Sequence, residues 1–140
     1  EGRFHEILDD PDPPASVGRV VLCSGKVYYD LVAAREAAGG TDAAILRVEQ
    51  LYPLHEERLR ALLETYGAAA EVCWVQEEPM NRGAWTFIAP RLAALLPGRT
   101  LRYAGRPASA SPATGSPRVH RDTQAALVRD ALGIPEEDNQ

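Results

Sequence analysis

Short apolar runs alternate with longer amphipathic segments along most of the chain, and glycine or proline separates them. The short runs are rich in β-branched residues, which is typical of buried strands. The longer segments repeat apolar positions every three or four residues, which is typical of helices with one buried face. The expected strands are 19–24, 43–48, 71–76 and 101–104, and the expected helices are 26–38, 55–66, 84–96 and 119–132.

Each expected helix has a stripe of residues that should face the sheet. These are Val27, Leu31, Ala34 and Ala38; then Leu59, Leu62, Leu63 and Tyr66; then Trp85, Ile88, Ala89, Leu92 and Leu96; and finally Ala125, Leu127, Val128 and Ala131. Because parallel neighbours need crossovers of this length, strands that alternate with helices imply a mainly parallel sheet. The predicted fold is therefore α/β and three-layered, with a mainly parallel sheet and helices on both faces.

The length of 140 residues fits one domain with flanking segments. Residues 1–17 include the acidic, proline-rich stretch DDPDPPAS and are expected to form an irregular linker arm from a preceding domain. Residues 18–134 are expected to form the α/β domain, and 135–140 a disordered tail. The sequence begins without Met, which favours a piece cut from a longer protein.

Composition excludes several classes of partner. A net charge of −5 gives the chain as a whole no strong attraction to nucleic acid or to an acidic membrane. No apolar run approaches the roughly 20 residues that cross a bilayer, and the first residues do not resemble a signal peptide. Cys23 and Cys73 lie within apolar runs and are expected to be buried and reduced, which favours a cytoplasmic protein.

Polar residues follow each expected strand, at the edge where ligands and partners of parallel sheets gather. The four segments are Ser24-Gly25-Lys26, Glu49-Gln50-Leu51-Tyr52-Pro53, Glu77-Glu78-Pro79 and Gly105-Arg106-Pro107. The first could hold an anion at a helix N-terminus, or could be a tight turn in which Ser24 caps the helix. Glu77 and Glu78 should point to opposite faces of an extended chain, which favours a structural or interface role over an acid–base pair.

Two further segments allow both a binding and a structural interpretation. The pattern Asn81-x-Gly83-x-Trp85 could present donors to a ligand, or could be a turn followed by Trp85 as an anchor in the core. Arginine and hydroxyl groups around the loop 106–117 could bind phosphate, although their pattern favours a solvated loop or one packed on another chain. The residues concerned are Arg102, Arg106, Ser109, Ser111, Arg118, His120 and Arg121.

Catalytic signatures are missing from the sequence. It contains no GxSxG, GxGxxG or HExxH pattern, and its three histidines do not have metal-ligand spacing. The residues alone therefore predict no catalytic, cofactor-binding or metal-binding side chain, and indicate only an α/β domain with a polar carboxyl edge.

Four long motifs together carry a resemblance to a known family. They are VVLCSGKVYYDL (20–31), ILRVEQLYPL (45–54), WVQEEPMNRGAW (74–85) and LRYAGRPASASPATGSPRVH (101–120). In this order they resemble the C-terminal domain of the decarboxylating, succinyl-transferring component of 2-oxoglutarate dehydrogenase, which is similar to the C-terminal domain of transketolase. The leading GRFHEILDD resembles the segment that joins this domain to the preceding one.

The resemblance implies a parent oxidoreductase of the citric acid cycle, a bacterial cytoplasmic homodimer that uses thiamine diphosphate and Mg²⁺. That enzyme decarboxylates 2-oxoglutarate and passes a succinyl group to the lipoyl arm of the acyltransferase component of a multienzyme complex. The family's GDG motif for the cofactor diphosphate is absent from this chain, so the resemblance implies that the cofactors are bound by earlier domains. Arg82 stands where family members often have Gln.

The resemblance also implies that this domain serves assembly and allosteric regulation. The candidate effector or interface residues are Ser24, Lys26, Glu77, Glu78, Asn81, Arg82, Arg106, Ser109 and His120. One hypothesis is an assembly domain that contacts preceding domains and a dimer partner through apolar patches. Another is a regulatory module that binds AMP or acetyl-CoA in an arginine-lined concavity, near the loop 106–120 or beside Ser24 and Lys26. The matching domain of another thiamine enzyme, such as a pyruvate dehydrogenase, is a third.

Overall fold

The structure is a computed structural model that describes residues 6–108 and 117–135. Its strands are β1 (Ile7–Leu8), β2 (Arg19–Cys23), β3 (Ala43–Val48), β4 (Glu71–Pro79) and β5 (Thr100–Arg106). Its helices are α1 (Val27–Ala37), α2 (Glu56–Thr65), α3 (Trp85–Leu95) and α4 (Pro117–Leu132). The predicted alternation of strands and helices is confirmed.

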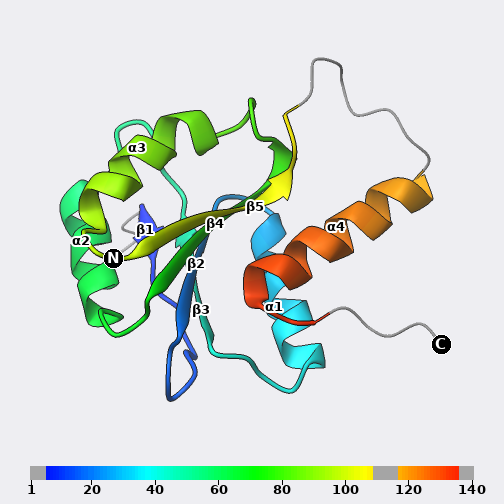
Figure 1. Ribbon diagram of the computed structural model, residues 1–140, viewed down its shortest axis with the longest axis horizontal. Coiled ribbons are helices and arrows are strands. Elements are labelled where there is room, and N and C mark those ends of the chain that lie inside the picture. Colours follow the sequence, from blue (N-terminus) through cyan, green and yellow to red (C-terminus); the bar gives the residue numbers. More distant parts are fainter. Residues whose placement is uncertain (1–5, 109–116, 136–140) are drawn as a thin grey trace, which may run out of the picture.

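The strands form one sheet in the order β1-β3-β2-β4-β5. The four longer strands run parallel, and β1 pairs antiparallel with the outer edge of β3. Helices α2 and α3 cover one face of this sheet, and α1 and α4 cover the other (Figure 1). The predicted three-layer α/β fold with a mainly parallel sheet is therefore confirmed.

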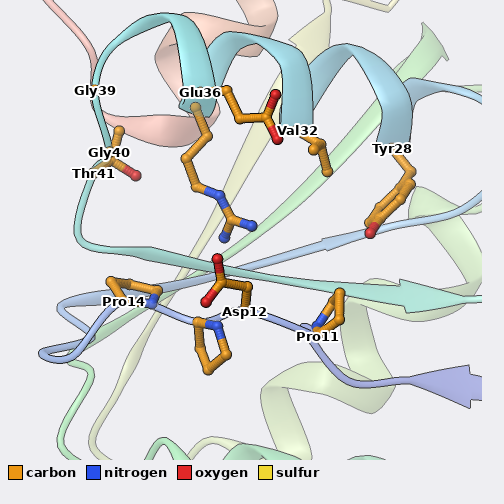
Figure 2. A pocket seen from close by; sticks show the side chains of 11 residues that line it. Pro11, Asp12, Pro14, Tyr28, Val32, Glu36, Gly39, Gly40 and Thr41 are labelled. Carbon is orange, nitrogen blue, oxygen red and sulfur yellow. The ribbon is translucent and has the colours of Figure 1, made fainter.

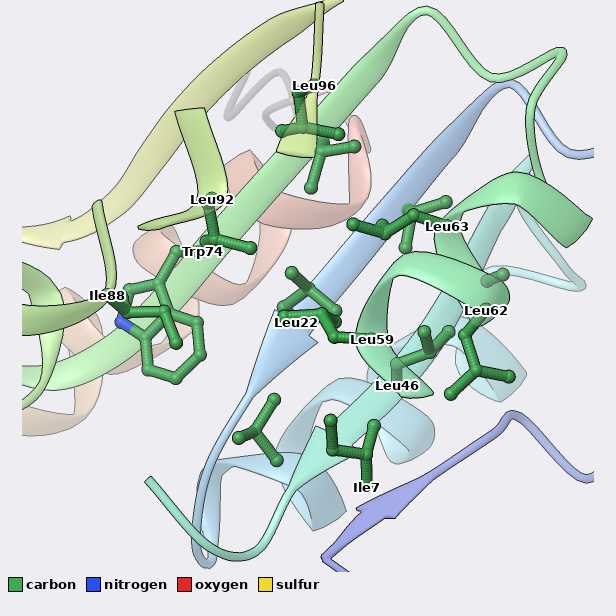
Figure 3. Packing of buried hydrophobic residues seen from close by; sticks show 14 of the residues in the cluster. Ile7, Leu22, Leu46, Leu59, Leu62, Leu63, Trp74, Ile88, Leu92 and Leu96 are labelled. Carbon is green, nitrogen blue, oxygen red and sulfur yellow. The ribbon is translucent and has the colours of Figure 1, made fainter. Parts of the chain in front are cut away.

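Alternate residues of the central strands feed two separate cores. On β2, Val20 and Leu22 pack under α2 and α3, whereas Val21 and Cys23 pack under α1 and α4. Trp74 is the largest fully buried side chain and lies in the first core (Figure 3). Burying one large apolar side chain contributes roughly 1.5–3 kcal/mol, so both faces of the sheet stabilise the fold.

Two strands are longer than predicted. The sequence suggested that Glu77-Glu78-Pro79 would end the third strand, but β4 continues to Pro79 and β5 continues to Arg106. A register shift between Val75 and Pro79 lets the two strands stay paired across this irregularity. Gly105 permits the close approach, because a Cβ there would lie 2.9 Å from the carbonyl oxygen of Gln76.

Several positions of the predicted helical stripes are not in the core. Tyr66 and Trp85 are half-buried, and Ala38 and Ala125 are exposed. Trp85 lies in the first turn of α3, at the margin of the sheet, where its ring packs 5.0 Å from that of Tyr103. Trp85 therefore packs against the first core from its margin without being fully buried, because periodicity locates the face of a helix but not the edge of the sheet beneath it.

Both cysteines are free and buried, as the sequence predicted. Burial raises the pKa of the Cys23 and Cys73 thiols to about 12, so neither is a thiolate at neutral pH. Among the described residues, no helix is long and apolar enough to span a bilayer.

Candidate functional site

The carboxyl ends of the parallel strands meet at one edge of the sheet, which we call the carboxyl edge. A cavity of about 530 Å³ opens there between the β2–α1 turn and the β4–α3 connection. The cavity is lined by Ser24, Gly25, Lys26, Leu51, Tyr52, Trp74, Gln76, Glu77, Glu78, Gly83 and Ala84. Three of the four polar segments predicted to meet at this edge therefore contribute to one cavity.

Gln76 stabilises the β4–α3 turn, which forms the rim of this cavity, through buried hydrogen bonds. Its side chain is buried, and its Oε1 accepts hydrogen bonds from the indole Nε1 of Trp74 and the backbone N of Trp85, both at 3.0 Å. Its Nε2 donates to the carbonyl oxygens of Pro79 and Arg82 at 2.9 and 2.7 Å. One amide thus fixes the turn between β4 and α3. Sequence reasoning missed Gln76, although it occupies the inward-facing position that continues the series Val72 and Trp74.

Gly83 allows the rim to fold tightly over that amide. Its φ of +67° lies in the left-handed region, and a Cβ there would come within 2.9 Å of Glu78 Oε2 and 3.2 Å of Gln76 Nε2. Asn81 and Arg82 are exposed in the same turn but do not line the cavity. The structure therefore separates these two candidates from Glu77 and Glu78.

The β2–α1 turn contributes a cation to the other side of the cavity. Lys26 is exposed, and its ammonium makes no hydrogen bond or ion pair with the described residues. No side-chain hydrogen bond caps α1, so the predicted capping role of Ser24 is wrong. The turn is instead closed by backbone, since Tyr28 N donates to Gly25 O, and Gly25 has a φ of +80°.

A second polar cluster joins β4, β5 and the start of α4. The guanidinium of Arg106 donates to the carbonyl oxygen of Glu77, and its Nη2 lies 3.2 Å from His120 Nδ1. Gln124 Nε2 donates to Glu77 Oε1 at 2.7 Å and to Asp30 Oδ2 at 3.0 Å. Arg106 and His120 are therefore in contact, as part of a network that the sequence did not reveal, because Gln124 is a polar helix position that belongs to no motif. Ser109, predicted to join this cluster, lies outside the described residues.

A groove of about 430 Å³ runs between α1 and α4 beside this cluster. It is lined by Asp30, Ala33, Ala34, His120, Arg121, Gln124, Ala125, Val128 and Arg129. An arginine-lined concavity was expected near the loop 106–120 or beside Ser24. The groove between α1 and α4 is lined by arginines, as expected. The cavity beside Ser24 is lined instead by Lys26 and two glutamates.

Exposed apolar side chains gather at the carboxyl edge. Among the described residues, the large hydrophobic side chains that are exposed are Tyr29, Tyr52, Met80 and Val119. Each lies in the segment that follows the carboxyl end of a parallel strand, or in the first turn of the helix after it. Exposed apolar groups concentrated at one edge are typical of a contact surface.

The described residues contain no group of three or more His, Cys, Asp or Glu side chains that could hold a metal ion.

Comparison with known proteins agrees with the sequence motifs. The profile of the family described as 2-oxoglutarate dehydrogenase C-terminal matches residues 1–132. The 2-oxoglutarate dehydrogenase E1 component of Haemophilus influenzae is 46% identical over 136 residues, which cover 95% of this chain and 14% of that protein. The E1 component of Azotobacter vinelandii is 45% identical over 139 residues, covering 95% and 15%. The oxoglutarate dehydrogenase of Buchnera aphidicola is 42% identical over 136 residues, again covering 95% and 15%. The chain thus spans about 15% of the length of these relatives.

Proposed function

The chain belongs to the 2-oxoglutarate dehydrogenase C-terminal family, and we propose that it is the assembly and regulatory domain of such an enzyme, without catalytic activity of its own. In this proposal the whole enzyme is a bacterial cytoplasmic homodimer that uses thiamine diphosphate and Mg²⁺. It decarboxylates 2-oxoglutarate and passes a succinyl group to the lipoyl arm of the acyltransferase component. Other domains hold the cofactors, and this domain supports them.

The observation that carries the proposal is the concentration of exposed apolar side chains at the carboxyl edge. Tyr29 is 62% exposed and Tyr52 is 65% exposed, although both are large enough to contribute substantially to a core. Lys26 adds a cation without a partner among the described residues, and Glu78 is also exposed. Aromatic side chains around a cavity with a few charges resemble the centre of a protein–protein interface more than an active site. We therefore infer that the carboxyl edge docks against preceding domains or the dimer partner.

A first experiment separates assembly from catalysis. The chain alone, mixed with thiamine diphosphate, Mg²⁺ and 2-oxoglutarate, is expected to release no CO₂ above background, and measurable turnover would falsify the assembly proposal. Circular dichroism on the same sample checks that the chain is folded.

A second experiment uses the whole protein that contains this chain. Tyr29→Ala combined with Met80→Ala should shift sedimentation toward the dissociated species and lower activity on dilution, because both side chains lie on the proposed contact surface. Arg60→Ala, at an exposed position of α2, is the matched control. An unchanged sedimentation profile for the double variant would contradict docking through the carboxyl edge.

The groove between α1 and α4 supports a second candidate function, the binding of AMP or acetyl-CoA. Arg121 and Arg129 line it together with His120, and arginine binds phosphate through a planar fork of donors. Calorimetric titration with each nucleotide tests this function. Saturable binding that Arg121→Ala abolishes, and Arg60→Ala leaves intact, would establish a regulatory site within this domain. The absence of binding to the chain, repeated with the whole protein, would remove this candidate.

A further inference from the structure

The outer edge of β3 is covered by a docked segment, Glu6–Asp10, that the sequence suggested was a plain linker. Within it, Ile7 pairs with Val48 and Leu8 with Arg47 in antiparallel register. The Ile7 side chain is completely buried in the core under α2 and α3 (Figure 3). The segment therefore completes both the sheet and one of its cores.

Side chains of α2 recognise the backbone and the charge of this segment. Arg58 Nε donates to the carbonyl oxygen of Ile7 at 2.7 Å, and the hydroxyl of Tyr66 donates to Asp9 Oδ1 at 2.7 Å. The backbone N of Glu49 donates to Glu6 O at 2.7 Å. These donors line a groove that runs along β3 and binds an extended chain.

Asp10 is the polar anchor at the far end of the groove. Its carboxylate is fully buried and accepts hydrogen bonds from both terminal nitrogens of Arg35, from Ile45 N at 2.8 Å and from Asp12 N at 2.9 Å. Arg35 also donates to Ala43 O at 3.1 Å. Where β1 has ended, the Asp10–Arg35 pair thus bonds to the backbone N of Ile45 and the carbonyl oxygen of Ala43. A neighbouring strand would otherwise bond to these groups at the edge of β3.

Most of residues 11–16, which follow Asp10, are exposed. Pro11, Pro13 and Pro14 cross over a cavity of about 450 Å³, whose opposite wall includes Tyr28 and Val32 of α1 (Figure 2). The proline-containing segment 11–14 would act as the hinge of an exchange. Prolines favour an extended backbone and have no backbone N–H to donate, so this hinge does not itself hold the docked segment against β3. The attachment resides in residues 6–10 and in the groove that receives them.

We propose that the outer edge of β3 is a strand-binding groove for an extended acidic segment, and that residues 6–10 of a second copy of this chain can occupy it by exchange. The ligand requirements follow from the contacts: an apolar side chain at the position of Ile7, and a carboxylate three residues later that reaches Arg35. A second copy meets both requirements because it carries the same segment. Exchange of an identical element through an extended hinge is a known route to dimers.

Disulfide trapping tests this exchange, using variants that each carry one introduced cysteine in a chain whose buried Cys23 and Cys73 are replaced by Ala. One population of the chain carries Leu8→Cys and the other Arg47→Cys, two positions that face each other across β1 and β3. After mixing, brief acidification, return to neutral pH and mild oxidation, a disulfide-linked pair is expected on a non-reducing gel, because facing strand positions satisfy disulfide geometry. The matched control replaces Arg47→Cys by Glu56→Cys, which is exposed on α2. No linked pair above this control would overturn the proposal.

Asp10→Asn gives a reciprocal readout that a merely structural role would not produce. Placed in the Arg47→Cys chain, it weakens the resident segment, frees the groove and should raise cross-linking several-fold. Placed in the Leu8→Cys chain, it weakens the incoming segment and should lower cross-linking by a similar factor. Asp12→Asn is the comparison variant in both positions and should have a much smaller effect, because Asp12 bonds to Asp10 only through its backbone N and its carboxylate acts on Arg35 without a hydrogen bond.

Equal effects of Asp10→Asn in the two positions would contradict recognition through the carboxylate. Should Arg47→Cys fail to fold, the pair Glu6→Cys and Glu49→Cys continues the same register, since Glu49 N donates to Glu6 O.

Discussion

The two ends of the parallel sheet differ in how far their charged side chains are paired within the chain. At the end where the strands begin, which we call the amino edge, charged side chains pair with one another. Arg19 bridges Asp42 at 3.0 Å and Glu71 at 3.1 Å, and Arg102 bridges the same Glu71 at 3.3 Å and Asp130 at 3.0 Å. The amino edge therefore satisfies its own charges within the chain.

The carboxyl edge combines internal pairs with exposed side chains. Glu77 and Arg106 are held by hydrogen bonds, but Lys26 is unpaired among the described residues, and Tyr29 and Tyr52 are exposed. A chain whose own stability were the only requirement would bury those rings or replace them. The amino edge therefore stabilises the domain through its own ion pairs, whereas the carboxyl edge carries exposed groups that, under the proposed function, are available to a partner.

The largest expected effect concerns the charged anchor beside the amino edge, Asp10. Burial alone would raise the pKa of this carboxyl, but the hydrogen bonds from Arg35 and from two backbone N–H groups outweigh it and lower the pKa below its ordinary value of 3.8. A carboxyl with a lowered folded pKa stabilises the fold above the unfolded pKa and loses that contribution as pH falls through the folded one. The melting temperature of the chain should therefore fall as the pH is lowered below about 4.

Comparison with Asp10→Asn isolates this contribution. The variant should melt well below the unaltered chain at neutral pH, and the gap should narrow as pH falls below about 4. Asp12→Asn should differ from the unaltered chain by much less than Asp10→Asn does, because its carboxylate acts on Arg35 without a hydrogen bond. A gap that stays constant down to strongly acidic pH would show that Asp10 is not the titrating anchor.

The second effect concerns Gln76, which makes the carboxyl edge depend on a buried polar group. Gln76→Leu removes the acceptor of the Trp74 indole N–H and the Trp85 backbone N–H. Each unsatisfied buried donor costs about 1–3 kcal/mol, so the chain should lose about 2–6 kcal/mol of unfolding free energy. Urea denaturation measures it. A loss below about 1 kcal/mol would show that the rim is held by other contacts.

Third in size is the charge network of the amino edge. Glu71→Gln keeps the shape of the side chain but removes the carboxylate shared by Arg19 and Arg102. Because all three side chains are about a quarter exposed, solvent screens the pairs, and the expected loss is about 1–2 kcal/mol. Glu78→Gln, at an exposed position of the carboxyl edge, is the matched control and should change stability by less than about 0.5 kcal/mol. Equal losses in the two variants would erase the contrast between the edges.

The smallest expected effect is that of Lys26→Met on the chain alone. Its ammonium has no partner among the described residues, so the unfolding free energy should change by less than about 0.5 kcal/mol. In the whole protein the same change should weaken assembly if the cation meets a partner. A large destabilisation of the isolated chain would instead assign Lys26 to the fold.

The sequence predicted the fold more completely than the site. Alternating runs such as Val20–Cys23 specify a strand buried on both faces, because each face then receives an apolar side chain. Where the burial of a side chain depends on the neighbouring elements, the periodicity of one helix did not predict that burial. Ala125 sits in a helical stripe but faces the groove between α1 and α4 and is exposed. The docked segment at Ile7 was read as a linker because a strand of two residues has no period of its own.

For the candidate site, parallel strands implied that the polar segments would meet, and three of them do line one cavity. The individual side chains that hold this cavity and the neighbouring polar cluster together could not be predicted from the sequence. Gln76 and Gln124 act through amides that bond to atoms distant in sequence, and such contacts exist only after the fold has formed. The roles of Ser24, Glu78 and the other candidates in binding remain predictions.

Hydrogen–deuterium exchange of the chain alone and within the whole protein tests most directly whether the carboxyl edge is a contact surface. The backbone amides of residues 24–29, 49–54 and 77–85 should exchange more slowly in the whole protein, whereas those of 41–43 and 97–100 at the amino edge should be unchanged. Protection confined to the amino edge, or no added protection at the carboxyl edge, would contradict the proposed role of this domain in assembly.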